Sequence, residues 1–208
     1  MLIKINELIQ HFNIKITGIL HIGAHECEEL NDYNNAGVDN QNIYWIEAMQ
    51  DKVDLNKSEN SDICIYQAVI DEVDDKEINF KITNNGESSS ILDFGSHEKH
   101  HPHVKVVETR NLKTNRMDTI IEKYNIPIEN LNFINLDIQG VELRALKSME
   151  KYFHYIKYIY TEVNIEEVYK NCNMMHEIDS YLAQFGFERV AQRIYTQFGW
   201  GDAFYMKT

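Results

Sequence analysis

The sequence predicts an α/β protein with a Rossmann-like, mostly parallel sheet, and three observations support this. Short apolar runs alternate with helical patterns along most of the 208 residues. The first two runs enclose a helical pattern and form a β-α-β unit, with Gly23 after the first run and Glu47 at the end of the second. The last two runs, 187–195 and 203–206, are joined by a short loop. Without a crossover helix they can only pair antiparallel, so the last strand should run against the others.

The first third of the chain contains the elements of this β-α-β unit and its neighbours. Leu2, Ile5 and Leu8 share a helical face, which predicts a covering helix. Gly37 stands where a helix C-cap is expected. The expected elements are the covering helix at about 1–13, a strand at 19–22, a helix that ends before Gly37, a strand at 43–46, a helix at 51–58 and a strand at 63–70.

In the middle of the chain the alternation of strand and helix patterns is interrupted, and it then resumes. Alternating apolar and polar residues at 76–83 predict a strand with one wet face, inside an insertion of strands and loops at about 72–110. The elements expected in and after it are strands at 76–83 and 104–107, a helix capped by Asp118 or Thr119, a strand at 131–136, a helix at 141–153, a strand at 158–161 and a helix that stops at Gly186.

Composition and charge exclude several classes of protein. The length fits one domain, 1–208, and the formal net charge of −13 argues against a nucleic-acid partner and against an anionic membrane surface. Cys27, Cys64 and Cys172 have neither disulfide nor zinc-site spacing, so we expect no structural metal. No apolar run is long enough to span a bilayer, and we expect a cytoplasmic protein.

Three predicted strands end on an acid, namely Glu47, Asp137 and Glu162. Ligands of open parallel sheets bind outside the carboxyl ends of the strands, so the three acids are expected in one cleft. One such acid alone is more often a solvated loop residue, but three on strands predicted to be parallel favour a shared cleft. The helix of the β-α-β unit is expected to open with Glu26, Glu28 and Glu29, which would repel a pyrophosphate there. This favours S-adenosylmethionine, a nucleoside with a cationic sulfonium, over NAD.

The chain resembles the FkbM-type methyltransferases, a branch of the class I S-adenosylmethionine-dependent enzymes. The resemblance rests on the order and spacing of several blocks rather than on any single one. They are His21-Ile22-Gly23-Ala24-His25, Trp45-Ile46-Glu47-Ala48, Asn85 to Ile91, Met117-Asp118, Leu136-Asp137-Ile138-Gln139-Gly140-Val141-Glu142, and Tyr160-Thr161-Glu162-Val163. It implies a seven-stranded class I methyltransferase sheet with helices on both faces.

The sequence departs from the family pattern at four positions. Histidines 21 and 25 replace the usual Asp and Asn, and Cys27 stands where a second glycine is common. Gln139 replaces an acid. These changes affect the part of the site where the methionine end of the cofactor is expected.

The resemblance implies methyl transfer, in most relatives to an oxygen of a sugar or another small hydroxylated acceptor. Glu47 would accept both ribose hydroxyls of the cofactor, and Asp137 would meet its methionine part or the acceptor. Glu162 would act on the acceptor side. The remaining cofactor-binding residues implied by the resemblance are Gly23, Ala24, His25, Ala48, Ala68, Val69 and Asp71.

Two polar segments in the insertion are candidates for the acceptor site. A histidine-rich segment, 97–103, could supply a general base for O-methylation, for which we select His100 and His101, with His97 as a contact. Its alternatives are a divalent metal held together with Asp137, or an exposed loop. Ser88, Ser89 and Ser90 could bind a polyol or simply stabilise a turn.

Two other functions remain as alternatives. One is an NAD-binding Rossmann oxidoreductase, which the incomplete glycine pattern and the glutamates after it disfavour. The other is a binding protein that kept the methyltransferase fold and lost the chemistry, which the changes at His21, His25 and Cys27 keep open.

Overall fold

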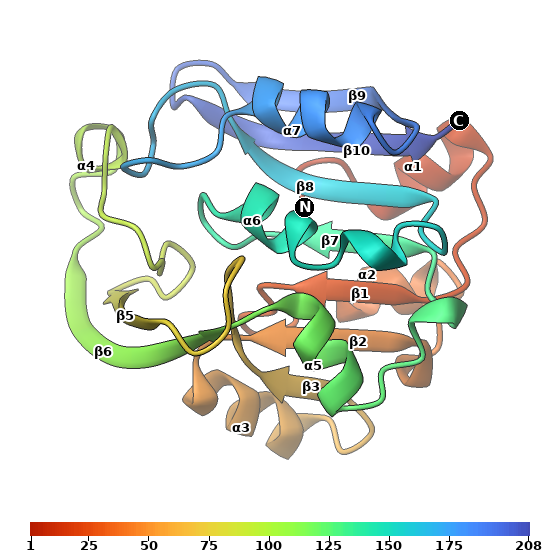
Figure 1. Cartoon of the computed structure of the whole chain (residues 1–208), viewed down its shortest axis with the longest axis horizontal. Coiled ribbons are helices and arrows are strands. Elements are labelled where there is room, and N and C mark those ends of the chain that lie inside the picture. The colour runs from red at the N-terminus through yellow and green to blue at the C-terminus, as the bar shows by residue number, and fades with distance from the viewer.

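A seven-stranded sheet forms the centre of the molecule, and the computed structural model describes all 208 residues (Figure 1). The strand order is β3-β2-β1-β7-β8-β10-β9. The strands are β1 (Ile19–Ile22), β2 (Ile43–Glu47), β3 (Cys64–Gln67), β7 (Phe133–Leu136), β8 (Tyr158–Asn164), β9 (Phe187–Tyr195) and β10 (Trp200–Lys207). The strands from β3 to β8 in this order are parallel, and β10 is antiparallel to both of its neighbours. The predicted fold class is confirmed.

The strand register brings the predicted acids to one edge of this sheet. The order reverses at β1, which pairs with β2 on one side and with β7 on the other. Ile22 lies beside Ile46 and beside Leu136. Gly23, Glu47 and Asp137 each follow one of these residues, so they meet at the switch point of the sheet.

Helices cover both faces of the sheet, and each face has its own apolar core. The helices α5 (Met117–Lys123), α6 (Glu142–Lys147) and α7 (Met175–Ala183) contribute to a cluster of 26 buried apolar residues on one face. The helices α1 (Ile5–Phe12), α2 (Leu30–Asn35) and α3 (Gln50–Glu59) contribute to a cluster of 17 such residues on the other. None of the helices combines the length and the apolar character that crossing a membrane requires.

The insertion forms a small second sheet that stands beyond the carboxyl ends of the parallel strands (Figure 1). Its strands are β4 (Val69–Ile70), β5 (Glu77–Thr83) and β6 (Val106–Asn115), and the short helix α4 (His97–His100) lies between the last two. The single strand expected at 63–70 is therefore two strands, because the chain leaves the main sheet at Ala68 and pairs with β6 instead. The strand expected at 104–107 overlaps only the start of the ten-residue β6, whose largely exposed polar side chains gave no apolar pattern.

Several expected local features differ in the structure. The first helix of the β-α-β unit begins at Leu30, so Glu26 and Glu28 precede it rather than occupy its opening turn. Neither Asp118 nor Thr119 caps α5, because Arg116 is the N-cap residue and the Ser148 hydroxyl accepts the N–H of Met117. The helix expected at 141–153 ends at Lys147 and is followed by a 3-10 turn, Glu150–Tyr152.

Candidate active site

A cavity of about 550 Å³ lies where the carboxyl ends of the parallel strands meet the insertion. Residues from the ends of β1, β2, β7 and β8, from β10 and from the insertion line it. Glu47, Asp137 and Glu162 all belong to this wall, as the argument from strand ends predicts. Its size is within the range of about 300–1,000 Å³ that is typical of small-molecule sites.

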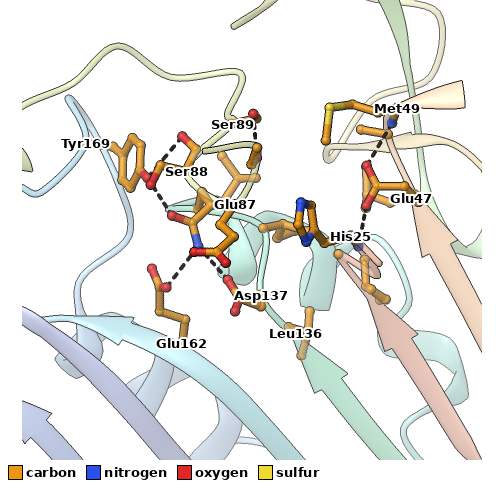
Figure 2. Close-up of a pocket in the computed structure, with 18 of the residues that line it drawn as sticks. His25, Glu47, Met49, Glu87, Ser88, Ser89, Leu136, Asp137, Glu162 and Tyr169 are labelled. Atoms are coloured by element: carbon orange, nitrogen blue, oxygen red, sulfur yellow. Dashed lines mark hydrogen bonds between the residues drawn. The ribbon is translucent and has the colours of Figure 1, made fainter. Parts of the chain in front are cut away.

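Glu47 is held in a fixed orientation at one end of the cavity (Figure 2). Its two carboxylate oxygens accept the backbone N–H of His25 at 2.7 Å and of Met49 at 2.8 Å. The side chain is 5% exposed, and burial raises its pKa although the two N–H groups oppose this rise. Each oxygen keeps a lone pair for a further donor, so the carboxylate can accept two neighbouring hydroxyls. Ala48, Ala68 and Val69 line the same cavity with apolar surface.

Gly23 is required by a contact between two loops of the protein. Its φ is +95°, and a Cβ built on it would lie 1.8 Å from the carbonyl oxygen of Asp137. Its N–H and that of Ala24 donate to the carbonyl of Ile46 at 2.9 and 3.0 Å. The glycine therefore lets the β1 and β7 loops touch, and this contact positions Asp137.

Two residues of the loop after β1, His25 and Cys27, differ from the family pattern, and both adopt left-handed backbone conformations. His25 has a φ of +43° and Cys27 a φ of +56°. A side chain in this region costs about 1–3 kcal/mol, which explains why glycine is common at the second position. Burial disfavours the charged His25 ring, but a 2.6 Å contact with Glu28 outweighs it and raises the pKa. The other ring nitrogen, Nε2, is buried without a hydrogen-bond partner, beside Gly86 of the insertion.

His21, the other substituted position, is a buried neutral residue. Burial lowers its pKa to about 4. Its ring stacks on Trp45, and its Nδ1 lies 3.0 Å from the Tyr33 hydroxyl. Asn135 donates to the same hydroxyl at 2.7 Å. His21 lines the cavity, but its ring is held by the buried side chains of Trp45 and Tyr33.

Asp137 and Glu162 face one another across the amide of Gln139 (Figure 2). The Gln139 Nε2 donates to Asp137 at 2.5 Å and to Glu162 at 3.0 Å, and its Oε1 accepts the hydroxyl of Tyr169. Burial and then the Asp202 charge raise the pKa of Asp137 to about 6. Burial and then the Asp137 charge raise the pKa of Glu162 well above its usual value. Both pKa values are raised, because the two carboxyl groups lie in the same cavity and a neighbouring carboxylate disfavours the charge of each.

Glu142 stabilises the loop that carries Gln139, and it was not among the residues expected in the site. It is 0% exposed, and its carboxylate accepts the N–H of Ile138 at 3.1 Å and of Gly140 at 3.0 Å. The loop that carries Gln139 is therefore built around a buried acid. The sequence could have indicated Glu142, because it belongs to the block 136–142 and follows Gly140 by two residues.

The histidine-rich segment divides between the cavity and the surface. His97, His101 and His103 line the cavity, whereas His100 bonds Glu166 at 2.6 Å outside it. His97 stacks on Phe94 with ring centroids 4.3 Å apart, and burial followed by the neighbouring His101 lowers its pKa to about 4. Burial and then the other histidines also lower the pKa of His101. No group of three or more His, Cys, Asp or Glu side chains is arranged to hold a metal ion, which the metal alternative for this segment requires.

Most predicted site residues reach the cavity, and four do not. Those in its wall are Gly23, His25, Glu47, Ala48, Ala68, Val69, Ser88, Ser89, His97, His101, Asp137 and Glu162. Ala24, Asp71, Ser90 and His100 lie outside it. Asp71 is buried and bonds Lys76 at 3.3 Å, and the Ser90 hydroxyl donates to the carbonyl of Gln139 at 2.8 Å. The binding and catalytic roles of all these residues stay predictions.

The serine run of the insertion mainly stabilises its own turn. The Ser89 hydroxyl donates to the Gly86 carbonyl at 2.6 Å and accepts the Thr83 N–H at 3.1 Å. The Ser88 hydroxyl accepts from Asn85 at 3.0 Å. Tyr169 lies 3.3 Å from the Ser88 carbonyl, so it connects this turn to Gln139. Tyr169 was not expected in the site.

The strand order, the antiparallel β10 and a cavity at the switch point define a class I methyltransferase fold. The family model described as the methyltransferase FkbM domain matches residues 21–189. The chain belongs to this family, as the resemblance in the sequence predicts. Class I methyltransferases take their methyl group from S-adenosylmethionine, which is therefore the cofactor. The family membership excludes the alternative of an NAD-binding oxidoreductase.

Solved structures agree on the fold. A methyltransferase FkbM from Methylobacillus flagellatus superposes with a TM-score of 0.54 at 14% identity over 91% of this chain, which spans 43% of that protein. Magnesium protoporphyrin IX methyltransferase from Synechocystis PCC 6803 with bound SAM gives a TM-score of 0.53 at 8% identity, covering 97% of this chain and 74% of that one. TrmK from M. capricolum with S-adenosyl-homocysteine gives 0.52 at 10% identity, covering 92% and 62%. A sequence comparison with curated proteins found no match.

Proposed function

We propose that this protein methylates an oxygen of a sugar or another small hydroxylated acceptor. The observation that carries the proposal is the arrangement of the cavity, with the fixed Glu47 carboxylate at one end and the Asp137–Gln139–Glu162 group at the other. A small acceptor rather than a nucleic acid is supported by the net charge of −13 and by a cavity wall without Lys or Arg.

The residues present fit S-adenosylmethionine. Glu47 would accept the two ribose hydroxyls, beside the apolar surface of Ala68 and Val69 for the adenine. Asp137 would lie near the cationic sulfonium, because a carboxylate stabilises a positive charge in a poorly screened cavity. When bound, S-adenosylmethionine would supply an electrophilic methyl carbon. The acceptor oxygen would bond to this carbon while the methyl–sulfur bond breaks and its electron pair stays on sulfur.

The acceptor hydroxyl must lose its proton in this step, and we assign His101 to receive it. His101 lines the cavity, and burial followed by the neighbouring histidines lowers its pKa, which favours the neutral ring. Its ring nitrogens have no hydrogen-bond partner within the protein, so a ring nitrogen is free to accept a proton. A general base of this kind contributes about 10²–10⁴-fold to the rate.

The test compares His101→Ala with His100→Ala, because the two histidines are adjacent in sequence but only one lines the cavity. Cofactor binding is measured by calorimetry, and turnover is followed with labelled S-adenosylmethionine and a pool of hydroxylated acceptors. His101→Ala should lower turnover by about a hundredfold at unchanged cofactor affinity, and His100→Ala should remain close to the wild type. Equal turnover of the two variants would refute the role of His101. Cofactor binding without turnover on any acceptor would favour the non-catalytic alternative.

A further inference from the structure

The cavity wall is strongly acidic and has no side-chain cation to balance it. Seven carboxylates line it and no Lys or Arg does; the seven are Glu28, Glu29, Glu47, Glu87, Asp137, Glu162 and Asp202. The amino group of Met1 is also there, but it is already paired with Glu29 at 3.0 Å. A phosphate or carboxylate on the acceptor would meet only like charges, which disfavours its binding.

Several of these acids already have partners. Glu47 accepts two backbone N–H groups, and Glu28 contacts His25. Asp202 accepts the N–H of Leu2 at 2.6 Å and the hydroxyl of Tyr160. Each of these carboxylates therefore has a donor inside the protein.

Of the three buried acids in this wall, Glu47, Asp202 and Glu162, only Glu162 accepts a single hydrogen bond from the protein. Its side chain is 6% exposed, and only Oε2 accepts a hydrogen bond, from Gln139. A buried carboxylate with few donors is stabilised by a paired cation or by retention of its proton. The raised pKa of Glu162 is consistent with a retained proton in the free cavity. A cation bound beside it would replace that proton.

The cavity wall that contains Glu162 also contains aromatic residues. Tyr160, Tyr169 and Trp200 line the same cavity, and His97 lies with its ring centroid 5.4 Å from that of Tyr169. The buried Nδ1 of His97 has no partner either. A carboxylate and aromatic rings in one cavity can bind an ammonium group together, through ion pairing and cation–π attraction.

We infer that the acceptor is a hydroxylated compound that carries a protonated amine, such as an amino sugar or an amino alcohol, and that its ammonium group pairs with Glu162. This rests on the proposed function, since it names the acceptor class of the same cavity. The ammonium would anchor the compound on the Glu162 side, and the hydroxyl that is methylated would face His101.

The experiment uses matched compounds on three scaffolds, a hexose, a cyclohexane polyol and a three-carbon diol, each carrying an ammonium, a neutral amide or a carboxylate. S-adenosylhomocysteine binding is measured first by calorimetry, and the compounds are then titrated into the saturated protein. On at least one scaffold the ammonium compound should bind at least tenfold more tightly than its amide, and the carboxylate should not bind. Titrations in buffers of different ionisation enthalpy should show that ammonium binding releases a proton.

The variant Glu162→Gln should lose both the tenfold preference and the proton release. Glu129→Gln is the matched control, because Glu129 is exposed and does not line the cavity. It should keep both properties. No preference for the ammonium compound on any scaffold, or tighter binding of a carboxylate, overturns the inference. Failure to bind S-adenosylhomocysteine would instead refute the proposed function.

Discussion

Replacing Glu142 with glutamine should change how the stability of the protein depends on pH. Glu142 is buried beneath the site, and burial raises its pKa from 4.5 to about 7. The protonated form is thus favoured in the folded state. Its contribution to stability is fully present below about pH 4.5 and is lost as the pH rises to about 7. Glutamine resembles the protonated acid and can still accept the N–H groups of Ile138 and Gly140.

The expected magnitude follows from this pKa. A rise from 4.5 to about 7 corresponds to about 3 kcal/mol of folding free energy, since each tenfold change in proton affinity is worth about 1.4 kcal/mol. The free energy of unfolding of Glu142→Gln, minus that of the wild type, should therefore increase by about 3 kcal/mol between pH 4 and pH 8. Urea unfolding at intervals of pH measures it, and the subtraction cancels groups that the substitution leaves unchanged.

The control is again Glu129→Gln, which removes one carboxylate from the surface instead of from the interior. The result that would refute the reasoning is a difference between Glu142→Gln and the wild type that stays flat or falls as the pH rises. A flat result would mean that the three N–H contacts stabilise the charged form as much as burial opposes it.

Two further predictions concern the cofactor end of the cavity. Glu47→Ala should weaken S-adenosylmethionine binding by about 1.5–3 kcal/mol in calorimetry, the range for hydrogen bonds to charged groups, and unchanged affinity in a folded variant would remove Glu47 from the site. Gly23→Ala should lower both the melting temperature and the cofactor affinity, because its Cβ would lie 1.8 Å from the Asp137 carbonyl oxygen. Gly37→Ala is its control, with a φ of +85° and no atom within 4 Å of a Cβ, so equal effects of the two substitutions would contradict a role for the loop contact.

The sheet and the acidic residues at its edge could be predicted because they depend on local patterns. Apolar runs that stop at Glu47 and Asp137 reveal both the strand and its end, and parallel strands bring these ends together whatever the details of packing. Glu162 was expected just after its strand, but β8 continues to Asn164 because these residues pair with β10. Even so, the register places Glu162 in the cavity wall.

The rest of the site depends on contacts between segments that are distant in the sequence. His97 and His100 are three residues apart in one short helix, yet one lines the cavity and the other bonds Glu166. No pattern in the sequence decides which side of a four-residue helix faces the ligand. Tyr169 lies in an irregular stretch after β8, and its role appears only when the insertion brings Ser88 beside it.

Gln139 shows why a departure from the family pattern is not a loss of the site. An acid at this position would have no N–H to donate and would place a third carboxylate between Asp137 and Glu162. The glutamine instead donates to both acids, accepts the hydroxyl of Tyr169, and has its carbonyl bonded by Ser90. A residue without an amide here would leave Asp137 and the buried Glu162 without a shared donor, at a cost of about 1–3 kcal/mol for the buried, unsatisfied carboxylate of Glu162. The amide is integrated with the insertion and with both acids, which argues for a maintained site rather than for one that has lost its chemistry.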